Sequence, residues 1–206
     1  MESADLIDKY TWAADVTRLE AWTMAVIDGR NLPDVLRIYG GDPDAPVGEL
    51  TFAGVDEHRG PQLDHLDFYV QMFMHGECVV AIENNGYSGS FPEIARRCSA
   101  DGGRFFSVYW NVNGFGLVTQ GIDGVITARF ETICPTAPEA DPGERRPEWA
   151  IGPETDIAVV RQTCMAQLER QTGVAVEERW LRERLPTYSI PGPYGLYRDV
   201  PGAEQP

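Results

Sequence analysis

The sequence predicts an α+β fold: a ferredoxin-like split βαβ repeat with a mostly antiparallel sheet, an extra C-terminal hairpin strand and two C-terminal helices. The first observation behind this prediction is an internal repeat. An apolar run at 25–28, a glycine-bearing turn and a helical run at 32–37 are matched later by 80–83, a longer glycine-bearing turn and 91–96. The chain therefore contains two related strand-helix units.

The second observation is a hairpin signal between these units. Two β-rich runs, 68–74 and 77–82, flank His75-Gly76. Right-handed crossovers then place the first and third strands, 22–27 and 77–82, side by side at the centre of the sheet and, we expect, parallel. Both runs are almost wholly apolar, as strands covered on both faces should be.

Asp28 and Glu83 end these two strands at equivalent positions of the repeat. If the strands are parallel, both carboxylates lie at the carboxyl edge of the sheet, where α/β sheets commonly bind ligands. A close, buried pair would raise one pKa and supply a general acid or base, so Asp28 and Glu83 are the candidate catalytic residues. The commoner role of a carboxylate before a helix is structural, through the helix dipole and capping.

The first half of the chain carries clear helix signals. Apolar residues at helical spacing predict a helix over 3–19, with Ser3 as a possible N-cap. A short helix begins near Pro33 and stops at Gly40-Gly41. A further helix follows Ser90, which we expect to be its N-cap. Residues 42–67, rich in Pro, Gly and acidic side chains, read as an irregular insertion.

The second half predicts an aromatic strand at 104–112 and a hairpin formed by 117–120 and 125–133. Residues 136–150 have the composition of a linker. An amphipathic helix opened by Pro153 and closed by Gly173, and a second helix at 176–185, complete the pattern. We therefore expect one domain over 1–186 and a Pro-, Gly- and Tyr-rich tail over 187–206.

Composition limits the classes of partner. The net charge of −15 argues against nucleic acid and anionic membranes, because both are bound through clustered Lys and Arg. It favours a basic protein partner instead. Lys9 is the only lysine among 17 basic residues, a usage that resembles proteins of GC-rich genomes such as those of actinobacteria.

No metal or cofactor site is expected. Four cysteines (Cys78, Cys98, Cys134, Cys164) and three histidines (His58, His65, His75) lack zinc-ligand spacing, and no nucleophile motif is present. The N-terminal residues lack the basic flank and apolar run of a signal peptide, and no window approaches the roughly 18 apolar residues of a spanning helix. These features predict a cytoplasmic protein.

The run from Glu83 through Gly86-Tyr87-Ser88-Gly89 to Arg97, with the Tyr-Trp-Asn-Val-Asn run at 109–113, resembles an actinobacterial family of small uncharacterised α/β proteins. The segments 22–40 and 172–181 extend the resemblance to about three-quarters of the chain. The resemblance implies a fold and a bacterial origin. It implies no catalytic residues.

Two groups of polar residues are candidates for ligand binding. Asn84, Asn85 and Gly86 could form an anion or substrate loop before a helix, although any strand-to-helix turn favours such residues. In the aromatic strand, Asn111 and Asn113 share one face and Trp110 lies on the other. Here too a turn at Asn113-Gly114 is the commoner explanation.

The tail carries Tyr188, Tyr194 and Tyr197 among prolines, a strip that loses little entropy on ordering. It either packs on its own sheet or binds a partner or a second copy. We interpret the chain as a non-catalytic bacterial binding or accessory protein, of the immunity type, that recognises a basic protein. The alternative is a small-molecule-binding protein or enzyme that uses Asp28 and Glu83.

Overall fold

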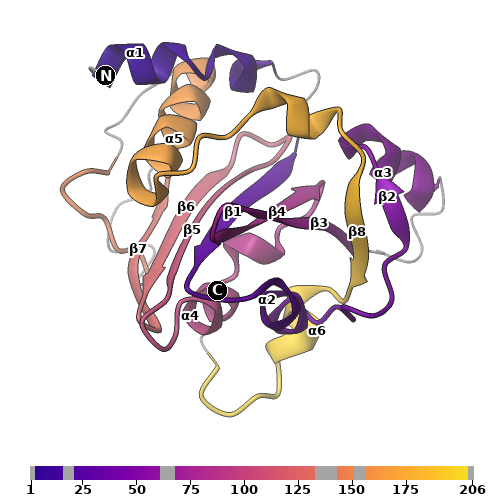
Figure 1. Ribbon diagram of the computed structural model, residues 1–206. Helices are drawn as coiled ribbons and strands as arrows, with labels where there is room; N and C mark the ends of the chain where they lie inside the picture. The colour runs from indigo at the N-terminus through magenta and orange to yellow at the C-terminus, as the bar shows by residue number, and fades with distance from the viewer. Residues whose placement is uncertain (1–2, 16–20, 61–67, 133–142, 151–155, 204–206) are drawn as a thin grey trace.

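The computed structural model describes residues 3–15, 21–60, 68–132, 143–150 and 156–203. Its centre is an eight-stranded sheet in the order β2-β8-β3-β4-β1-β5-β6-β7 (Figure 1). Every neighbouring pair is antiparallel. The strands are β1 Trp22–Asp28, β2 Gly48–Leu50, β3 Phe68–His75, β4 Cys78–Asn84, β5 Arg104–Trp110, β6 Gly116–Ile122, β7 Val125–Glu131 and β8 Leu185–Ile190. The α+β class and the antiparallel sheet are thus confirmed.

Helices cover both faces of the sheet, so the molecule has two cores. In Figure 1 α1 and α5 lie toward the top and α2, α4 and α6 toward the bottom. The helices and 3-10 turns are α1 Ser3–Asp8, η1 Thr11–Ala14, α2 Leu32–Ile38, α3 Phe52–Arg59, η2 Ser88–Ser90, α4 Pro92–Cys98, α5 Ile157–Thr172, η3 Glu178–Leu181 and α6 Pro193–Tyr197. Alternation along β1 sends Trp22, Met24 and Val26 to the α5 core and Ala25 and Ile27 to the α2/α4 core.

Local side-chain and backbone contacts set several helix ends. The Asn31 side chain accepts a hydrogen bond from the backbone N–H of Asp34 at 2.9 Å and so caps α2. The helix expected to open at Pro153 begins instead at Ile157, because Asp156 caps α5 in the same way; residues 151–155 lie outside the described ranges. Gly173 ends α5, as expected, with a left-handed φ of 75°. The expected cap of α4 is wrong: Phe91 occupies that position, and the Ser90 hydroxyl donates to the carbonyl of Tyr87.

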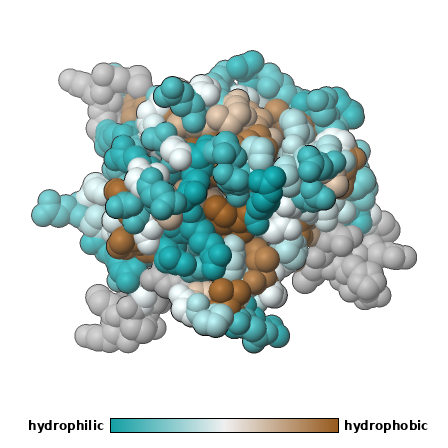
Figure 2. Space-filling view, turned by 60° about the horizontal axis from the view of Figure 1, so that its bottom comes forward, coloured by the Kyte–Doolittle hydropathy of each residue, from teal (hydrophilic) through white to brown (hydrophobic). Residues whose placement is uncertain are grey.

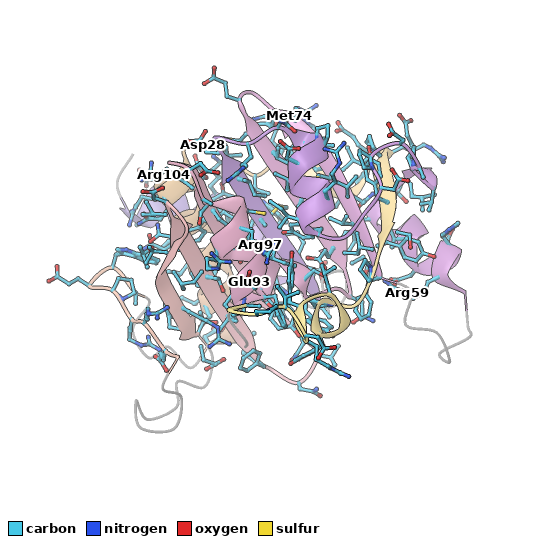
Figure 3. The ribbon with its side chains drawn as sticks, turned by 90° about the horizontal axis from the view of Figure 1, so that it is seen from below. Asp28, Arg59, Met74, Glu93, Arg97 and Arg104 are labelled. Atoms are coloured by element: carbon cyan, nitrogen blue, oxygen red, sulfur yellow. The ribbon has the colours of Figure 1, made fainter. Side chains whose placement is uncertain are left out.

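The expected direction of the two central strands is also wrong. β1 and β4 are neighbours, but they run antiparallel, with Thr23 opposite Glu83 and Ile27 opposite Val79. Asp28 therefore lies five residues along β1 from the position opposite Glu83, about 17 Å at the usual rise of a strand. Figure 3 shows Asp28 and Arg59 at opposite ends of the molecule, and Arg59 donates to the carbonyl of Asn84, beside Glu83. The two carboxylates form no pair.

Two segments that were expected to lie outside the core belong to the sheet. The 42–67 insertion contains β2 and α3, and its residues 61–67 lie outside the described ranges. The second C-terminal helix was expected over 176–185. Within that range only the short turn η3 is helical, and β8 begins at Leu185. β8 lies between β2 and β3, so the boundary expected at 186 falls inside a strand. Cross-strand pairing outweighs the strand-breaking signal of Pro186.

Some other expectations are confirmed, and some concern segments that lie partly outside the described residues. Both hairpins form, β3 with β4 and β6 with β7. The N-terminal helix is divided into α1 and η1, and residues 16–20 lie outside the described ranges, as do 133–142. The described end of the linker is not a simple spacer, because Trp149 packs against Phe106 and Phe130 at ring-centroid distances of 5.8 Å.

Candidate functional site

The carboxyl ends of β4 and β5 meet at one edge of the sheet, because both strands run antiparallel to β1 between them. This edge collects most of the residues that the sequence singled out: Glu83, Asn84, Asn85, Gly86, Trp110, Asn111 and Asn113. Asp28 is at the opposite edge. The candidate site is therefore built around Glu83 alone.

Glu83 is 1% exposed and points into the α2/α4 side of the sheet. Its two carboxylate oxygens accept hydrogen bonds from the backbone N–H groups of Ser88, at 2.9 Å, and Gly89, at 2.7 Å. Burial raises the pKa of Glu83 to about 7, and the amide donors of Gly89 and Ser88 oppose that rise. No lysine, arginine or histidine of the described segments forms an ion pair with it.

The loop between β4 and α4 is held down by two more buried side chains. The Thr23 hydroxyl donates to the carbonyl of Gly86 at 2.6 Å, and the Ser107 hydroxyl donates to the carbonyl of Gly89 at 2.7 Å. A Cβ on Gly86 would lie 2.6 Å from Glu83 Oε2, so this close approach requires glycine. The amides that an anion would use at Ser88 and Gly89 are already occupied by Glu83.

Asn84 and Asn111 have structural partners. The Asn84 side-chain amide donates to the carbonyl of Phe52 at 2.7 Å and to Asp56 Oδ2 at 2.9 Å, which ties α3 to β4. The Asn111 Oδ1 accepts the N–H groups of Asn113, at 2.9 Å, and Phe115, at 3.2 Å, and so closes the β5–β6 turn.

The other three predicted ligand-binding residues differ in exposure. Trp110 is buried on the α5 side, with its ring centroid 5.0 Å from that of Trp22. Asn85, with a left-handed φ of 51°, and Asn113 are exposed. Only these two asparagines offer free side chains to a ligand at this edge.

An aromatic surface, consisting of Tyr87, Tyr109, Phe115 and Tyr194, lies next to the Glu83 loop. The ring centroids of Tyr87 and Tyr194 are 5.9 Å apart, and those of Tyr109 and Phe115 are 6.1 Å apart. Tyr194 is 51% exposed and Phe115 42%. Figure 2, turned to bring α2, α4 and α6 forward, shows hydrophobic areas set among hydrophilic ones on this side of the molecule.

The tail tyrosines divide into two kinds. Tyr188 is buried in β8, and Tyr197 is buried with its hydroxyl donating to the carbonyl of Ile38 at 2.5 Å. The tail therefore packs on its own sheet, and Tyr194 is the tail tyrosine that remains available to a partner.

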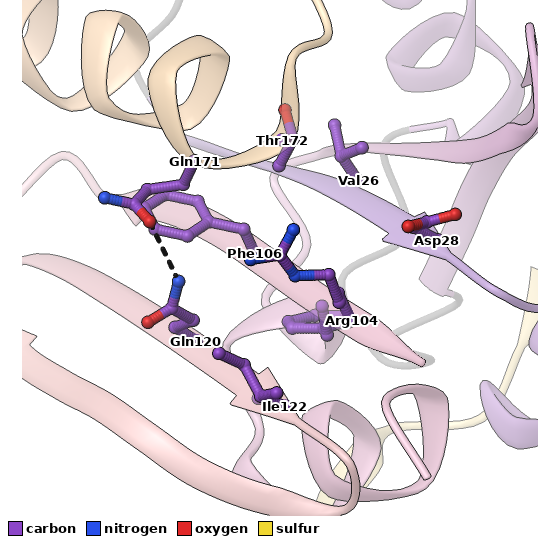
Figure 4. Close-up of a pocket in the computed structure, with 10 residues that line it drawn as sticks. Val26, Asp28, Arg104, Phe106, Gln120, Ile122, Gln171 and Thr172 are labelled. Carbon is purple, nitrogen blue, oxygen red and sulfur yellow. Dashed lines mark hydrogen bonds between the residues drawn. The ribbon is translucent and has the colours of Figure 1, made fainter. Parts of the chain in front are cut away.

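Asp28 lines a separate, small cleft with Arg104, Gln120 and Gln171 over Phe106 (Figure 4). The Gln120 amide donates to Gln171 Oε1 at 3.2 Å. The cleft encloses about 20 Å³, room for about one water and far below the several hundred Å³ of a typical ligand pocket.

A family model matches residues 4–185 of the chain, which is most of its length; its description is a family of unknown function, DUF6461. The chain belongs to the DUF6461 family. Neither the curated proteins nor the solved structures include a significant match. The matched residues contain the Glu83 loop and β1 to β7, and they end as β8 begins.

In the described segments of this DUF6461 chain, no cluster of His, Cys, Asp or Glu could hold a metal ion. None of the helices in those segments is long and apolar enough to cross a lipid bilayer. Cys78, Cys98 and Cys164 are free thiols, and Cys134 lies outside the described ranges.

Sequence reasoning missed Tyr87, Tyr109 and Phe115 in the aromatic surface of this DUF6461 chain. One signal was available for Tyr109: alternation along β5 places it on the face opposite Trp110 and beside Thr23 and Glu83. Tyr87 lies in an irregular loop, where no periodicity indicates which way a side chain points.

Proposed function

We propose that the protein is a non-catalytic binding or accessory protein that recognises a basic protein partner. The observation that carries this proposal is an acidic edge, defined as Asp42, Asp44, Glu49 and Glu57. All four side chains are exposed, and none forms an ion pair within the described segments. They lie along one stretch that includes β2, the strand at the end of the sheet, and α3, which packs against it.

The arginines of the protein do little to neutralise this edge. Several of the described ones pair with nearby acidic residues of their own segments: Arg37 with Asp34, Arg59 with Asp56, Arg96 and Arg97 with Glu93, Arg179 with Glu177 and Arg182 with Glu178. The net charge of −15 therefore includes acidic groups without local counter-charge. Such a surface attracts cationic partners and speeds their association.

The small-molecule or enzyme alternative has less support. It rested on a carboxylate pair formed by Asp28 and Glu83, and these residues lie at opposite ends of β1 and β4. The cleft beside Asp28 has the volume of about one water.

The decisive experiment compares two variants that lose the same number of negative charges. One is Asp42→Asn/Asp44→Asn/Glu49→Gln/Glu57→Gln, and its control is Asp5→Asn/Asp8→Asn/Glu77→Gln/Glu148→Gln, at exposed positions elsewhere. Binding of a synthetic lysine- and arginine-rich peptide is measured by calorimetry at low ionic strength. We expect the acidic-edge variant to bind more weakly than the control variant. Equal weakening would show that only net charge matters, and the proposal would fail.

We also propose a more specific fold type and a bacterial origin for the chain. The order β3-β4-β1-β5, with α2 and α4 on one face, supports a ferredoxin-like split βαβ core. Actinobacterial origin, cytoplasmic location and the immunity-type role stay predictions, as do self-association and the exclusion of nucleic acid.

A further inference from the structure

The aromatic surface and the buried carboxylate together suggest a specific recognition element. We infer that Tyr87, Tyr109 and Tyr194, next to Glu83, form a cation-binding site for one lysine or arginine side chain of the basic partner. The inference rests on the proposed function and adds a second contact point, distinct from the acidic edge.

The first argument is geometric, since three separate segments bring the tyrosines together. Tyr109 and Glu83 are both opposite Thr23, so the three side chains form one row on the same face of the sheet. Tyr87 comes from the loop that Glu83 holds, and Tyr194, from α6, lies against it at a tilt of 52°. Burial raises the pKa of Tyr87, and the neighbouring acidic groups Tyr194, Tyr109 and Glu83 raise it further, so these groups are close to Tyr87.

The second argument is electrostatic. The faces of aromatic rings attract cations, and aromatic side chains recognise ammonium groups in other proteins. Two backbone amides hold the Glu83 carboxylate, but it has no ion-pair partner in the described segments, and a buried charge is costly unless it is paired. A cation at the Tyr87–Tyr194 contact would supply this missing counter-charge. An anion would meet the same carboxylate and be repelled.

The third argument concerns Tyr194, which the fold does not need as an anchor. Tyr197 already fixes α6 through its buried ring and its hydrogen bond to Ile38. Tyr194 contacts Phe91 edge-on at 5.3 Å but leaves half of its surface open. A tyrosine ring packed on one side and half exposed on the other offers a partner both an apolar face and a hydroxyl, and tyrosine is enriched among binding hot spots.

The test uses small probes that cannot span to the acidic edge: the N-acetyl, N-methylamide forms of lysine, trimethyllysine and arginine, with norleucine as the uncharged control. Binding is followed by NMR of the tyrosine ring protons. We expect the cationic probes to shift the rings of Tyr87, Tyr109 and Tyr194 but not that of the buried Tyr188, and norleucine to shift none.

Variants then locate the contact. Tyr194→Ala should weaken binding of the cationic probes about threefold or more, and Tyr194→Phe should keep it, because the ring face is retained. Glu83→Gln should also weaken it, whereas Tyr188→Phe, in β8, should not. Equal binding of norleucine, or unchanged binding to Tyr194→Ala, would overturn the inference.

The outcome separates this inference from the proposed function. If Tyr194→Ala binds the basic peptide as tightly as the wild type while the acidic-edge variant does not, the cation site is wrong and the proposed function stands. If the wild type binds neither the peptide nor the probes, both fail.

Discussion

Thr23 and Glu83 face each other across β1 and β4, and both fasten the same loop. Thr23 binds the carbonyl of Gly86, and Glu83 binds the amides of Ser88 and Gly89. The loop is thus held at Gly86 through its carbonyl oxygen, and at Ser88 and Gly89 through their N–H groups. This arrangement fixes Tyr87, which lies between them, and makes the aromatic surface depend on the buried polar groups beneath it.

The pH dependence of stability should report on Glu83. Its pKa is 4.5 ordinarily and about 7 in the folded protein, so folding favours the protonated form. That contribution is present in full below about pH 4.5 and is lost as the pH rises to about 7. The free energy of unfolding of the wild type should fall by up to about 3 kcal/mol relative to Glu83→Gln over this range.

Urea denaturation of both proteins at pH 5 and pH 7.5 measures this difference. Asp28→Asn is the control, because Asp28 is exposed and forms no ion pair in the described segments, so its effect should stay within about 0.5 kcal/mol. Parallel pH dependence of the wild type and Glu83→Gln would contradict the assigned burial effect.

Thr23→Val should destabilise the protein by about 1–3 kcal/mol, because the buried carbonyl of Gly86 loses its donor while the side-chain shape is preserved. Thr11→Val, at an exposed position, should change stability by less than about 0.5 kcal/mol. Thermal unfolding of the two variants distinguishes the results. A Thr23→Val protein as stable as the wild type would mean that another donor replaces the hydroxyl.

Gly89→Ala should destabilise the loop by about 1–3 kcal/mol through overpacking. The added Cβ would lie 2.8 Å from Thr23 Cγ2 and 3.0 Å from the buried hydroxyl oxygen of Tyr39. Gly195→Ala is the matched control, since a Cβ there meets nothing within 4 Å and the residue is in α6; it should be neutral or slightly stabilising. Chemical denaturation compares them, and equal stability of the two variants would refute the close packing of Gly89.

Truncation should show where the domain ends. A chain that stops at residue 186 loses most of β8, which lies between β2 and β3, and should unfold or aggregate because β3 gains an open edge. A chain that stops at residue 200 keeps β8 and the Tyr197 hydrogen bond and should remain folded. Circular dichroism and size-exclusion chromatography test both chains. A folded, monomeric 1–186 chain would restore the boundary that the sequence indicated.

By itself the sequence determined what depends on neighbouring residues. The proline in the first turn of α2, the stop of α5 at Gly173 and the two hairpins all follow from residues within a few positions. The acidic character of the surface likewise follows from composition. Sequence reasoning also selected Glu83 and its glycine-rich loop, since a carboxylate, asparagines and glycines before a helix are a local pattern.

The tertiary structure alone decided how distant segments meet. The direction of β4 relative to β1 separates Asp28 from Glu83, and no residue near either one encodes that direction. The same is true of β8, which pairs with β3 although Pro186 and the preceding helical pattern argue against a strand. Tyr87, Tyr109 and Tyr194 become neighbours only because the strands that lead to them pair in this order. Strand order and direction are set by which apolar faces pack together across the whole chain, so local propensity cannot specify them.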